Sequence, residues 1–427
     1  MRQDIRDLAV ATCDLLALGE PTHREPAFGR VRNELIVQLA DFGFRSVALE
    51  TDRVAALGVN DFVQGAAGSL DAVMNEGFSH GFGELEANRR LVAWMRAHNR
   101  NRPPRERLAF HGFDAPLENA SAPSPRRYLE HARDHLELDL DLTGLLGDDE
   151  RWSRTEAVMD PAESVGASPE AGRLRSLGDD MLTLLSARAP DRDAAPSYAR
   201  WHEARTHLTA GLGLLRYHRQ AAQPLDHGAR MYRLLATRDA LMAQNLLDIR
   251  GIESRRGPTL VFGHNLHLQH VPSTWRSADV QVTWPGAGCV VAALLGERYA
   301  FVAGSLGRST ALGLQDPAPD TYEGRLQDDD RSWGLTTGGS FAGARARTDT
   351  TPQQGYFPLD RPVLDTADAI LHIGEGAVGP GARPRPVPSA GEHRDGGERR
   401  DRDGKDSPGP AEPDTRFAVD QGLSRRS

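Results

Sequence analysis

Short apolar runs alternate with amphipathic segments over about the first 115 residues of the chain. The runs are typical of buried strands and lie at residues 15–19, 46–50 and 108–112. The amphipathic segments carry apolar side chains at helical spacing and lie at residues 26–42 and 84–99. Strands that alternate with helices in this way predict a parallel sheet with helices packed on its faces.

The helix predicted at residues 26–42 has a recognisable start. Thr22 is followed three positions later by Glu25, just before the apolar positions begin. A hydroxyl residue and a glutamate at this spacing can satisfy each other's backbone N–H groups at a helix N-terminus. The pair therefore predicts a capping box.

The strand pattern stops between residues 115 and 250 and then resumes. Helical segments are predicted at residues 128–138, 170–188, 198–219 and 229–250. Strand-like runs return at residues 259–263, 299–304 and 369–373, while residues 307–358, rich in Gly, Thr and Asp, predict long loops. The expected fold class is α/β, with a mostly parallel sheet core flanked by helices and split by a helical insertion.

This pattern divides the chain into three parts. Residues 1–114 and 251–375 are expected to form the split α/β catalytic core, and residues 115–250 a helical block that forms part of a cleft. Residues 376–427 are rich in Gly, Pro and mixed charge and contain few large apolar side chains. Such a segment buries too little surface to offset its ordering entropy, so it is predicted to be a disordered C-terminal tail.

Composition removes several classes of function. Cys13 and Cys289 are the only cysteines, which excludes a disulfide framework and thiolate zinc sites. The net charge of −9 disfavours nucleic acid and anionic membrane as partners. The only lysine, Lys405, lies in the predicted tail, so a Schiff-base lysine is not expected in the folded part. With no apolar stretch near 18 residues and no leader-like N-terminus, the expected location is cytoplasmic.

One local pattern occurs twice. Residues 15–23 read LLALGEPTH and residues 259–267 read TLVFGHNLH, each an apolar run, a glycine, three residues and a histidine. Ligands bind beyond the carboxyl ends of strands in open α/β sheets. The side chains expected to surround one crevice there are Glu20, His23, His264, Asn265 and His267, with Glu50 at the end of a third strand. Imidazoles and carboxylates together can perform acid/base chemistry, although a glycine in this position can also simply mark a turn.

Three other motifs do not fit their chemistry. The run WHEARTH at residues 201–207 resembles H-E-x-x-H, but His202 and His207 are five residues apart and about 140° apart on a helix, so they cannot share a metal on one face. The run GGSFAG at residues 338–343 follows no strand, unlike a serine nucleophile elbow. No phosphate-binding glycine loop follows a strand.

Several of these residues together resemble the erythromycin esterase family, which includes succinoglycan-biosynthesis-like and erythromycin esterase-like hydrolases. The resemblance covers about residues 7–374 and rests on GEPTHREPAFGRVR at 19–32, the strand-ending Glu50, RDALMAQN at 238–245 and GHNLH at 263–267. It extends to HGFD at residues 111–114. The resemblance implies a hydrolase of carboxylic esters or lactones, with macrolide antibiotics as the best-known substrates and antibiotic resistance as the consequence.

The resemblance also implies roles for individual residues. His23 would be the general base that activates a water, with Glu20 and Glu50 holding the imidazole and the water. His264 would be the second catalytic histidine, and Arg32 a conformational or electrostatic partner. The residues assigned to substrate binding are Asp114, Arg238, Asn265 and His267. No cofactor and no metal are expected, and the partner is a small-molecule ester or lactone.

Alternatives remain open at this stage. Arg238 and Asp239 can form a structural ion pair, and Asn265 can cap a helix rather than face the substrate. The two histidines and two glutamates can bind a metal, which would make the protein a metal-dependent hydrolase. A ligand-binding or haem-binding protein on the same fold, with His264 or His267 as an axial ligand, is a further alternative. The acyl group of the substrate and the oligomeric state are not fixed by the sequence.

Overall fold

The structure is a computed structural model that describes most of the chain up to Gly376. The described residues are 5, 13–118, 120–191, 194–276, 280–327, 332–337 and 341–376. The predicted tail falls outside them except for its first residue, Gly376, whose N–H donates to the carbonyl of Arg308.

A seven-stranded sheet forms the centre of the described part, in the order β3-β2-β4-β1-β7-β9-β8. Its parallel strands are β1 (Leu15–Glu20), β2 (Ser46–Asp52), β3 (Ala109–Asp114), β4 (Thr259–His264), β7 (Tyr299–Arg308) and β9 (Ala369–Glu375). The edge strand β8 (Trp333–Thr336) is antiparallel to β9. A separate hairpin joins β5 (Ser273–Arg276) to β6 (Gln281–Trp284). The predicted α/β class with a mostly parallel sheet is confirmed.

Helices cover both faces of this sheet. Successive side chains of each strand point to opposite sides, so each strand supplies apolar side chains to both faces. In β1, Leu16 and Leu18 belong to one apolar cluster, and Leu15 and Ala17 to another. The first cluster includes side chains of α2 (Pro26–Asp41), α3 (Ala55–Gln64), α4 (Leu70–Glu76) and α5 (Glu86–Asn99). The second includes side chains of α12 (His227–Glu253), α13 (Asn265–Leu268), α14 (Ala287–Leu295), α15 (Tyr322–Leu326) and α16 (Arg361–Thr366). Burial on both faces explains why the strands read as continuous apolar runs.

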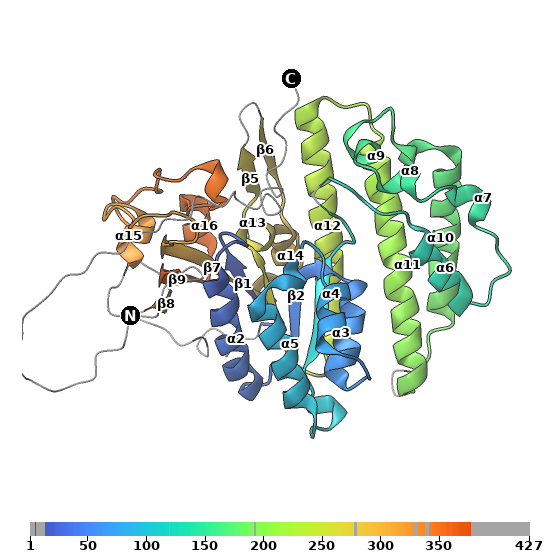
Figure 1. Cartoon of the computed structure of the whole chain (residues 1–427), viewed down its shortest axis with the longest axis horizontal. Helices are drawn as coiled ribbons and strands as arrows, with labels where there is room; N and C mark the ends of the chain where they lie inside the picture. Colours follow the sequence, from blue (N-terminus) through green and yellow to red (C-terminus); the bar gives the residue numbers. More distant parts are fainter. Residues whose placement is uncertain are drawn as a thin grey trace, which may run out of the picture.

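The segment between β3 and β4 is helical. Its elements before α12 are α6 (Arg126–His135), α7 (Thr143–Leu146), α8 (Glu150–Ser153), α9 (Thr155–Met159), α10 (Pro169–Ala187) and α11 (Ala195–Ala221). They enclose an apolar cluster of their own, and Figure 1 shows them grouped beside the sheet with α12 in between. Because α12 packs against β3, α14 and β6 as well as against α11, the division at residue 250 remains a proposal.

Two local predictions are wrong. Helix α2 begins at Pro26, and its N-cap is Glu25, whose carboxylate accepts the N–H of Ala27. Thr22 therefore lies outside the cap and instead accepts the N–H of Arg24, so no capping box forms. The segment 307–358 contains α15 and β8 in addition to loops. Short 3₁₀ turns complete the fold at Phe82–Glu84, Pro104–Glu106, Val165–Ala167, Gly296–Arg298 and Pro352–Gln354. Within the described ranges, no helix is long and apolar enough to cross a membrane.

Candidate active site

The carboxyl ends of three adjacent strands bring the predicted residues together. Strand β4 lies between β1 and β2, and Glu20 at the end of β1 pairs in register with His264 at the end of β4. On the other side of β4, the carboxylate Oε2 of Glu50 accepts the backbone N–H of His264 at 2.7 Å. The side chains predicted from the repeated strand–glycine–histidine pattern therefore lie together in one cluster.

The two glycines of that pattern make room for site side chains. A Cβ on Gly263 would lie 2.8 Å from Oε2 of Glu50, and a Cβ on Gly19 would lie 2.1 Å from Oδ1 of Asn265. Neither glycine has a positive φ. Both positions therefore need glycine for close approach of a neighbouring side chain, rather than for a turn.

His23 is held between two carboxylates. Its Nδ1 lies 2.8 Å from Oε1 of Glu20, and its Nε2 lies 3.6 Å from Oε1 of Glu50. Burial raises the pKa of the Glu20 carboxyl, and the hydrogen bond from His23 opposes this rise. With Nδ1–H donating to Glu20, Nε2 keeps its lone pair and faces Glu50. This tautomer is the one that a general base requires.

Glu50 lies at the centre of the cluster. Its Oε1 has three nitrogen neighbours, Nε2 of His23 at 3.6 Å, Nε2 of His267 at 3.4 Å and Nη2 of Arg238 at 3.6 Å. Its side chain is only 4% exposed. A buried carboxylate is costly unless cationic and N–H groups surround it, and Arg238 and the backbone N–H of His264 supply that compensation.

A second carboxylate orients His267. Nδ1 of His267 lies 2.8 Å from Oδ1 of Asp239, and Asp239 also accepts the indole N–H of Trp284 and the backbone N–H of Ala287. Burial lowers the pKa of His267, but the charges of Asp239 and Glu50 outweigh it and the net shift is upward. Asp239 therefore joins α12 to β6, α13 and α14, and Arg238 and Asp239 do not pair with each other as the sequence allowed.

His264 faces His23 across the crevice. The two ring centroids are 5.1 Å apart, and Nδ1 of His264 accepts the backbone N–H of Leu266 at 3.2 Å. Nε2 of His264 is therefore the nitrogen that carries the proton in the neutral ring. Phe82 packs 5.0 Å from the His23 ring and Phe357 packs 5.0 Å from the His264 ring. The histidine pair thus has aromatic walls suited to an apolar substrate.

Arg238 and Asp114 form the side of the crevice nearest the helical segment. Nη2 of Arg238 lies 2.7 Å from Oδ2 of Asp114, and Nε2 of His80 lies 2.9 Å from the same oxygen. Nδ1 of His80 lies 3.0 Å from Oε2 of Glu118. Burial lowers the pKa of His80, but the bonds to Asp114 and Glu118 outweigh it and raise the pKa to about 9. Burial also acts against the Asp114 charge, yet Arg238 and His80 hold the pKa of that carboxyl well below its usual range.

Arg32 and Asn265 are buried near the site and form hydrogen bonds with neighbouring residues. Arg32 is 1% exposed, donates to the side-chain oxygens of Asn33 and Asn88, and stacks 4.7 Å from the Phe262 ring. Burial lowers the pKa of Arg32 to about 10, and the Glu20 charge opposes this shift. Asn265 is the first residue of α13, and its amide bonds both the N–H and the carbonyl of Gly304 at 2.9 Å. His264, rather than Asn265, is the N-cap of that helix.

Sequence reasoning did not assign six residues of the cluster to the site. They are His80, Phe82, Glu118, Asp239, Trp284 and Phe357. His80 and Phe82 lie between α4 and α5, where no strand end marks them. Asp239 was considered only as a partner of Arg238. Neighbouring residues on a helix point about 100° apart, and this geometry could have indicated that Asp239 and Arg238 contact different partners.

The potential metal ligands lie elsewhere. Within the described residues, the one group of three or more histidine, cysteine or acidic side chains close enough to hold a metal ion is His131, Glu203 and His207. These residues lie on α6 and α11, and none of them is a predicted site residue. Hydrolysis without a metal therefore stays a prediction.

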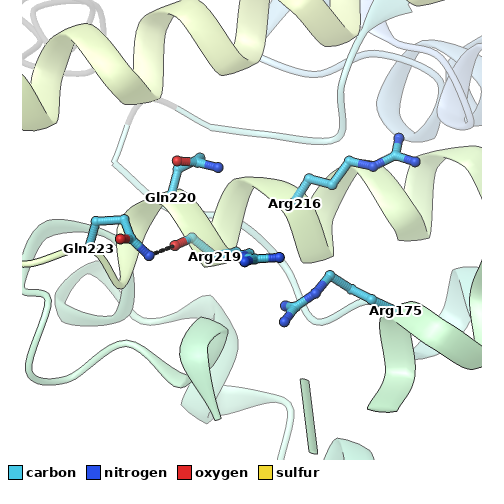
Figure 2. Close-up of a pocket in the computed structure, with 5 residues that line it drawn as sticks. All are labelled: Arg175, Arg216, Arg219, Gln220 and Gln223. Carbon is cyan, nitrogen blue, oxygen red and sulfur yellow. Dashed lines mark hydrogen bonds between the residues drawn. The ribbon is translucent and has the colours of Figure 1, made fainter. Parts of the chain in front are cut away.

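A pocket of about 400 Å³ lies between α10 and the end of α11 (Figure 2), away from the strand ends. Its lining consists of Arg175, Arg216, Arg219, Gln220 and Gln223. Figure 2 shows the guanidinium groups of Arg175 and Arg219 directed toward each other. Burial, followed by the charge of Arg219, lowers the pKa of Arg175. Cationic walls do not suit an apolar ester, and the pocket contains none of the predicted site residues, so the histidine cluster remains the candidate active site.

Comparison with solved structures shows the same fold in three proteins of low sequence identity. A Bacillus cereus protein superposes with a TM-score of 0.62 at 16% identity, covering 87% of this chain and 90% of its own. A succinoglycan biosynthesis protein gives 0.59 at 14% identity, with 87% and 90% coverage. A mutant of the erythromycin esterase EreC in its open conformation gives 0.60 at 18% identity, with 87% and 93% coverage. No curated protein matches the chain.

The sequence profile described as erythromycin esterase matches residues 39–387. The match includes Glu50, Asp114, Arg238 and His264, whereas the motif at residues 19–32 precedes it. It spans well over half of the chain and confirms the resemblance stated from the motifs. The chain therefore belongs to the erythromycin esterase family and is a hydrolase of the macrolide esterase type.

Proposed function

We propose that the protein hydrolyses carboxylic esters or lactones with a water that His23 activates. The observation that carries this proposal is the placement of His23 between Glu20 and Glu50. One carboxylate accepts from Nδ1 at 2.8 Å, and the other lies 3.6 Å from Nε2. This arrangement fixes a neutral tautomer with its lone pair toward a second carboxylate, where a water can be held and deprotonated.

In the first step, a water bound by Nε2 of His23 and Oε1 of Glu50 attacks the acyl carbon. The water proton moves to Nε2, the new carbon–oxygen bond forms, and the electrons of the carbonyl double bond move to its oxygen. Glu20 stabilises the imidazolium that results, because its carboxylate accepts from Nδ1. Nε2–H of His264 donates to the developing oxyanion, since its Nδ1 already accepts from Leu266.

In the second step, the tetrahedral intermediate collapses. The carbon–oxygen bond to the alcohol breaks, and the imidazolium of His23 returns its proton to the leaving alkoxide. Arg238 remains bound to Asp114 and lies 3.6 Å from Oε1 of Glu50, so its positive charge faces the Glu50 carboxylate during the cycle. Arg32 acts through Glu20 and does not contact the substrate, since its side chain is buried and bonded to Asn33 and Asn88. No step requires a cofactor.

We infer that the substrate class is a large, mostly apolar lactone or ester such as a macrolide. Phe82 and Phe357 line the histidine pair, while Arg238, Asp114 and His80 form a polar side. Apolar walls with a few placed polar groups favour a ligand of mixed character. Location in the cytoplasm and action on macrolide antibiotics remain part of the proposal.

The test is hydrolysis of a panel of macrolides and simple aryl esters, with ring-opened or cleaved products identified by mass. His23→Ala should lower kcat/KM by about 10²–10⁴-fold, the usual contribution of general acid/base catalysis. Glu50→Gln should also lower it strongly, because the neutral amide lacks the negative charge that orients and polarises the water. His98→Ala is the matched control, since His98 lies on α5 beside Trp94. Unchanged hydrolysis in both site variants would overturn these roles.

A further inference from the structure

The helical segment contains a group of potential metal ligands that the esterase reaction does not use. His131 lies on α6, and Glu203 and His207 lie on α11. One ligand atom from each residue lies within 4.8 Å of those of the other two. The group crosses between two helices that pack closely along their lengths.

Helix geometry explains how α11 supplies two of the three ligands. Glu203 and His207 are four residues apart, so they lie on the same face one turn from each other. This spacing is the one that His202 and His207 lack. The run WHEARTH therefore does contain a usable helical pair, Glu203 with His207, although it is not the pair of H-E-x-x-H.

The third ligand comes from the neighbouring helix. The rings of His131 and His207 stack with centroids 3.8 Å apart and planes 11° apart, and Nε2 of His131 lies 3.8 Å from Oε1 of Glu203. Nδ1 of His207 bonds the backbone carbonyl of Glu203 at 3.0 Å. Nδ1 is therefore the protonated nitrogen of His207, and Nε2 carries the lone pair that a metal needs.

We propose that His131, Glu203 and His207 bind one divalent transition-metal ion of the Zn²⁺ class. Two imidazoles and one carboxylate form a ligand set that zinc accepts, with water in the fourth position. Ca²⁺ and Mg²⁺ prefer oxygen ligands and do not suit it. Tetrahedral zinc needs its ligand atoms about 3.3 Å apart, given bonds of roughly 2.0–2.1 Å. The exposed side chains can close the remaining distance by rotation, since His131 is 35% and Glu203 is 49% exposed.

The neighbouring charges set the affinity. The pKa of His207 is lowered, and burial is the largest cause. The hydrogen bond to the Glu203 carbonyl opposes this shift, and the charges of His131, Glu203 and Arg127 have smaller effects. The charge of Arg127 acts on His207, and the charge of Arg200 acts on the neighbouring His135. These two positive charges oppose a bound cation, so we expect micromolar rather than tighter binding.

The bound ion would connect α6 to α11. A metal that binds only the folded state raises the apparent stability with the logarithm of one plus the ratio of its concentration to Kd. We therefore expect Zn²⁺ at about 100 times its Kd to raise the melting temperature by several degrees. Hydrolysis should be unaffected, because the ion would lie on helices that carry none of the proposed catalytic residues.

The test is titration of the untagged, chelator-treated full chain with ZnCl₂ by calorimetry, together with the visible spectrum after addition of Co²⁺. One ion per chain and a tetrahedral cobalt spectrum are expected, both lost in His131→Asn and in His207→Asn. His227→Asn, at the exposed start of α12, is the matched control and should bind as the wild type does. Melting of each metal-free variant shows that it is folded.

Two results would overturn the proposal. One is no heat and no cobalt spectrum at 100 µM metal, a concentration of about 10 to 100 times a micromolar Kd. The other is binding that survives in both helix variants but disappears in His23→Ala, which would place the ion at the strand ends. Because the readouts are metal binding and melting, failure here leaves the proposed ester hydrolysis untouched.

Discussion

Glu20 shows how one buried carboxylate can be both costly and useful. Burial raises its pKa, and the hydrogen bond to His23 partly opposes this. Burying the negative charge of Glu20 costs free energy. Its attraction to His23 offsets this cost only when His23 becomes an imidazolium, because an ion pair is strongest at low dielectric. In the mechanism we propose, Glu20 would therefore stabilise the state that forms during the reaction more than the resting state.

A substitution separates the charge of Glu20 from its hydrogen bond. In Glu20→Gln the amide oxygen can still accept Nδ1–H of His23, but the negative charge is lost. We expect kcat to fall by about 10–100-fold, the usual effect of removing such a supporting partner, with little change in KM. Steady-state kinetics on the best ester of the panel measures this. A fall in Glu20→Gln as small as in His98→Ala would contradict the orienting role.

His80 gives a prediction about stability and pH. Its folded-state pKa of about 9 lies above the ordinary value of 6.5, because Asp114 and Glu118 favour the protonated ring despite burial. A raised pKa of this kind contributes stability that is fully present below pH 6.5 and is lost as the pH rises through about 9. His80→Gln should therefore destabilise the fold by roughly 3 kcal/mol at pH 6, and much less at pH 10.

Urea unfolding of the wild type and His80→Gln at both pH values checks this. His98→Gln is the control, since its difference from the wild type should not shrink at alkaline pH. A His80→Gln difference that is the same at pH 6 and pH 10 would show that the ring acts through packing alone. The backbone of His80 has a φ of 58°, an uncommon conformation for a residue other than glycine. Its three hydrogen bonds to Asp114 and Glu118 compensate for that strain.

Three of the residues that sequence reasoning found lie at or near the end of a strand. Glu20 and His264 end β1 and β4, Glu50 lies two residues before the end of β2, and adjacent parallel strands bring these positions together. His80 and Trp284 could not be found in this way, because they reach the cluster from a loop and from a hairpin. Their positions depend on packing between segments far apart in sequence, which periodicity does not report.

At the scale of elements, Asn265 fixes α13 against β7. Its amide accepts the N–H of Gly304 and donates to the carbonyl of the same residue, both at 2.9 Å. Gly19 on the intervening β1 leaves the space that the amide occupies, with Oδ1 2.1 Å from where a Cβ would be. This contact holds α13, and with it His264 and His267, above the end of the sheet.

Gly19→Ala should therefore displace Asn265 and break both bonds. We expect a loss of about 3 kcal/mol in the free energy of unfolding, from two buried hydrogen bonds and the steric strain. Asn265→Ala should cost a similar amount. In the double variant the losses should sum to less than the two separate values, because the same contact is removed twice. Full additivity in denaturant unfolding would refute the coupling, and Gly58→Ala, with open space around its Cβ position, is the control.

Two residues of α12 that are adjacent in sequence contact different segments of the protein. Arg238 reaches Asp114 on β3, whereas Asp239 reaches His267 on α13 and Trp284 on β6. Neighbouring residues of a helix point about 100° apart, so the two side chains serve opposite sides of the site. The ion pair between the helical segment and the core that the sequence left open is formed by Arg238 with Asp114, whereas Asp239 pairs with His267.

At the scale of the whole molecule, the sequence was sufficient for the class of the fold but not for its strand order. Strands β1, β2, β3, β4, β7 and β9 all coincide with predicted runs, because strands buried on both faces are continuously apolar. The placement of β4 between β1 and β2 was not predicted. It is set by long-range packing, with Ser46 and Thr259 hydrogen bonded across the junction at 2.7 Å.

The segment after Gly376 gives a prediction about the whole chain. Residues 377–427 lie outside the described residues, and their composition offers few apolar side chains for a core. We expect a chain that ends at Gly376 to keep the kcat/KM and melting temperature of the full chain. Side-by-side kinetics and melting curves measure this. A large loss in either quantity would show that the C-terminal segment takes part in folding or in the site.

The central position of β4 has a consequence for the order in which the protein is made. Ser46 and Thr259 are 213 positions apart, yet their strands are neighbours. At roughly 5–20 residues per second, β1 and β2 leave the ribosome roughly 10–40 s before the strand that joins them. During that interval the contiguous helices α6–α11 can already pack on their own apolar cluster. The cluster of Glu20, Glu50 and His264 can therefore be completed only after β4 has been synthesised and has inserted between β1 and β2.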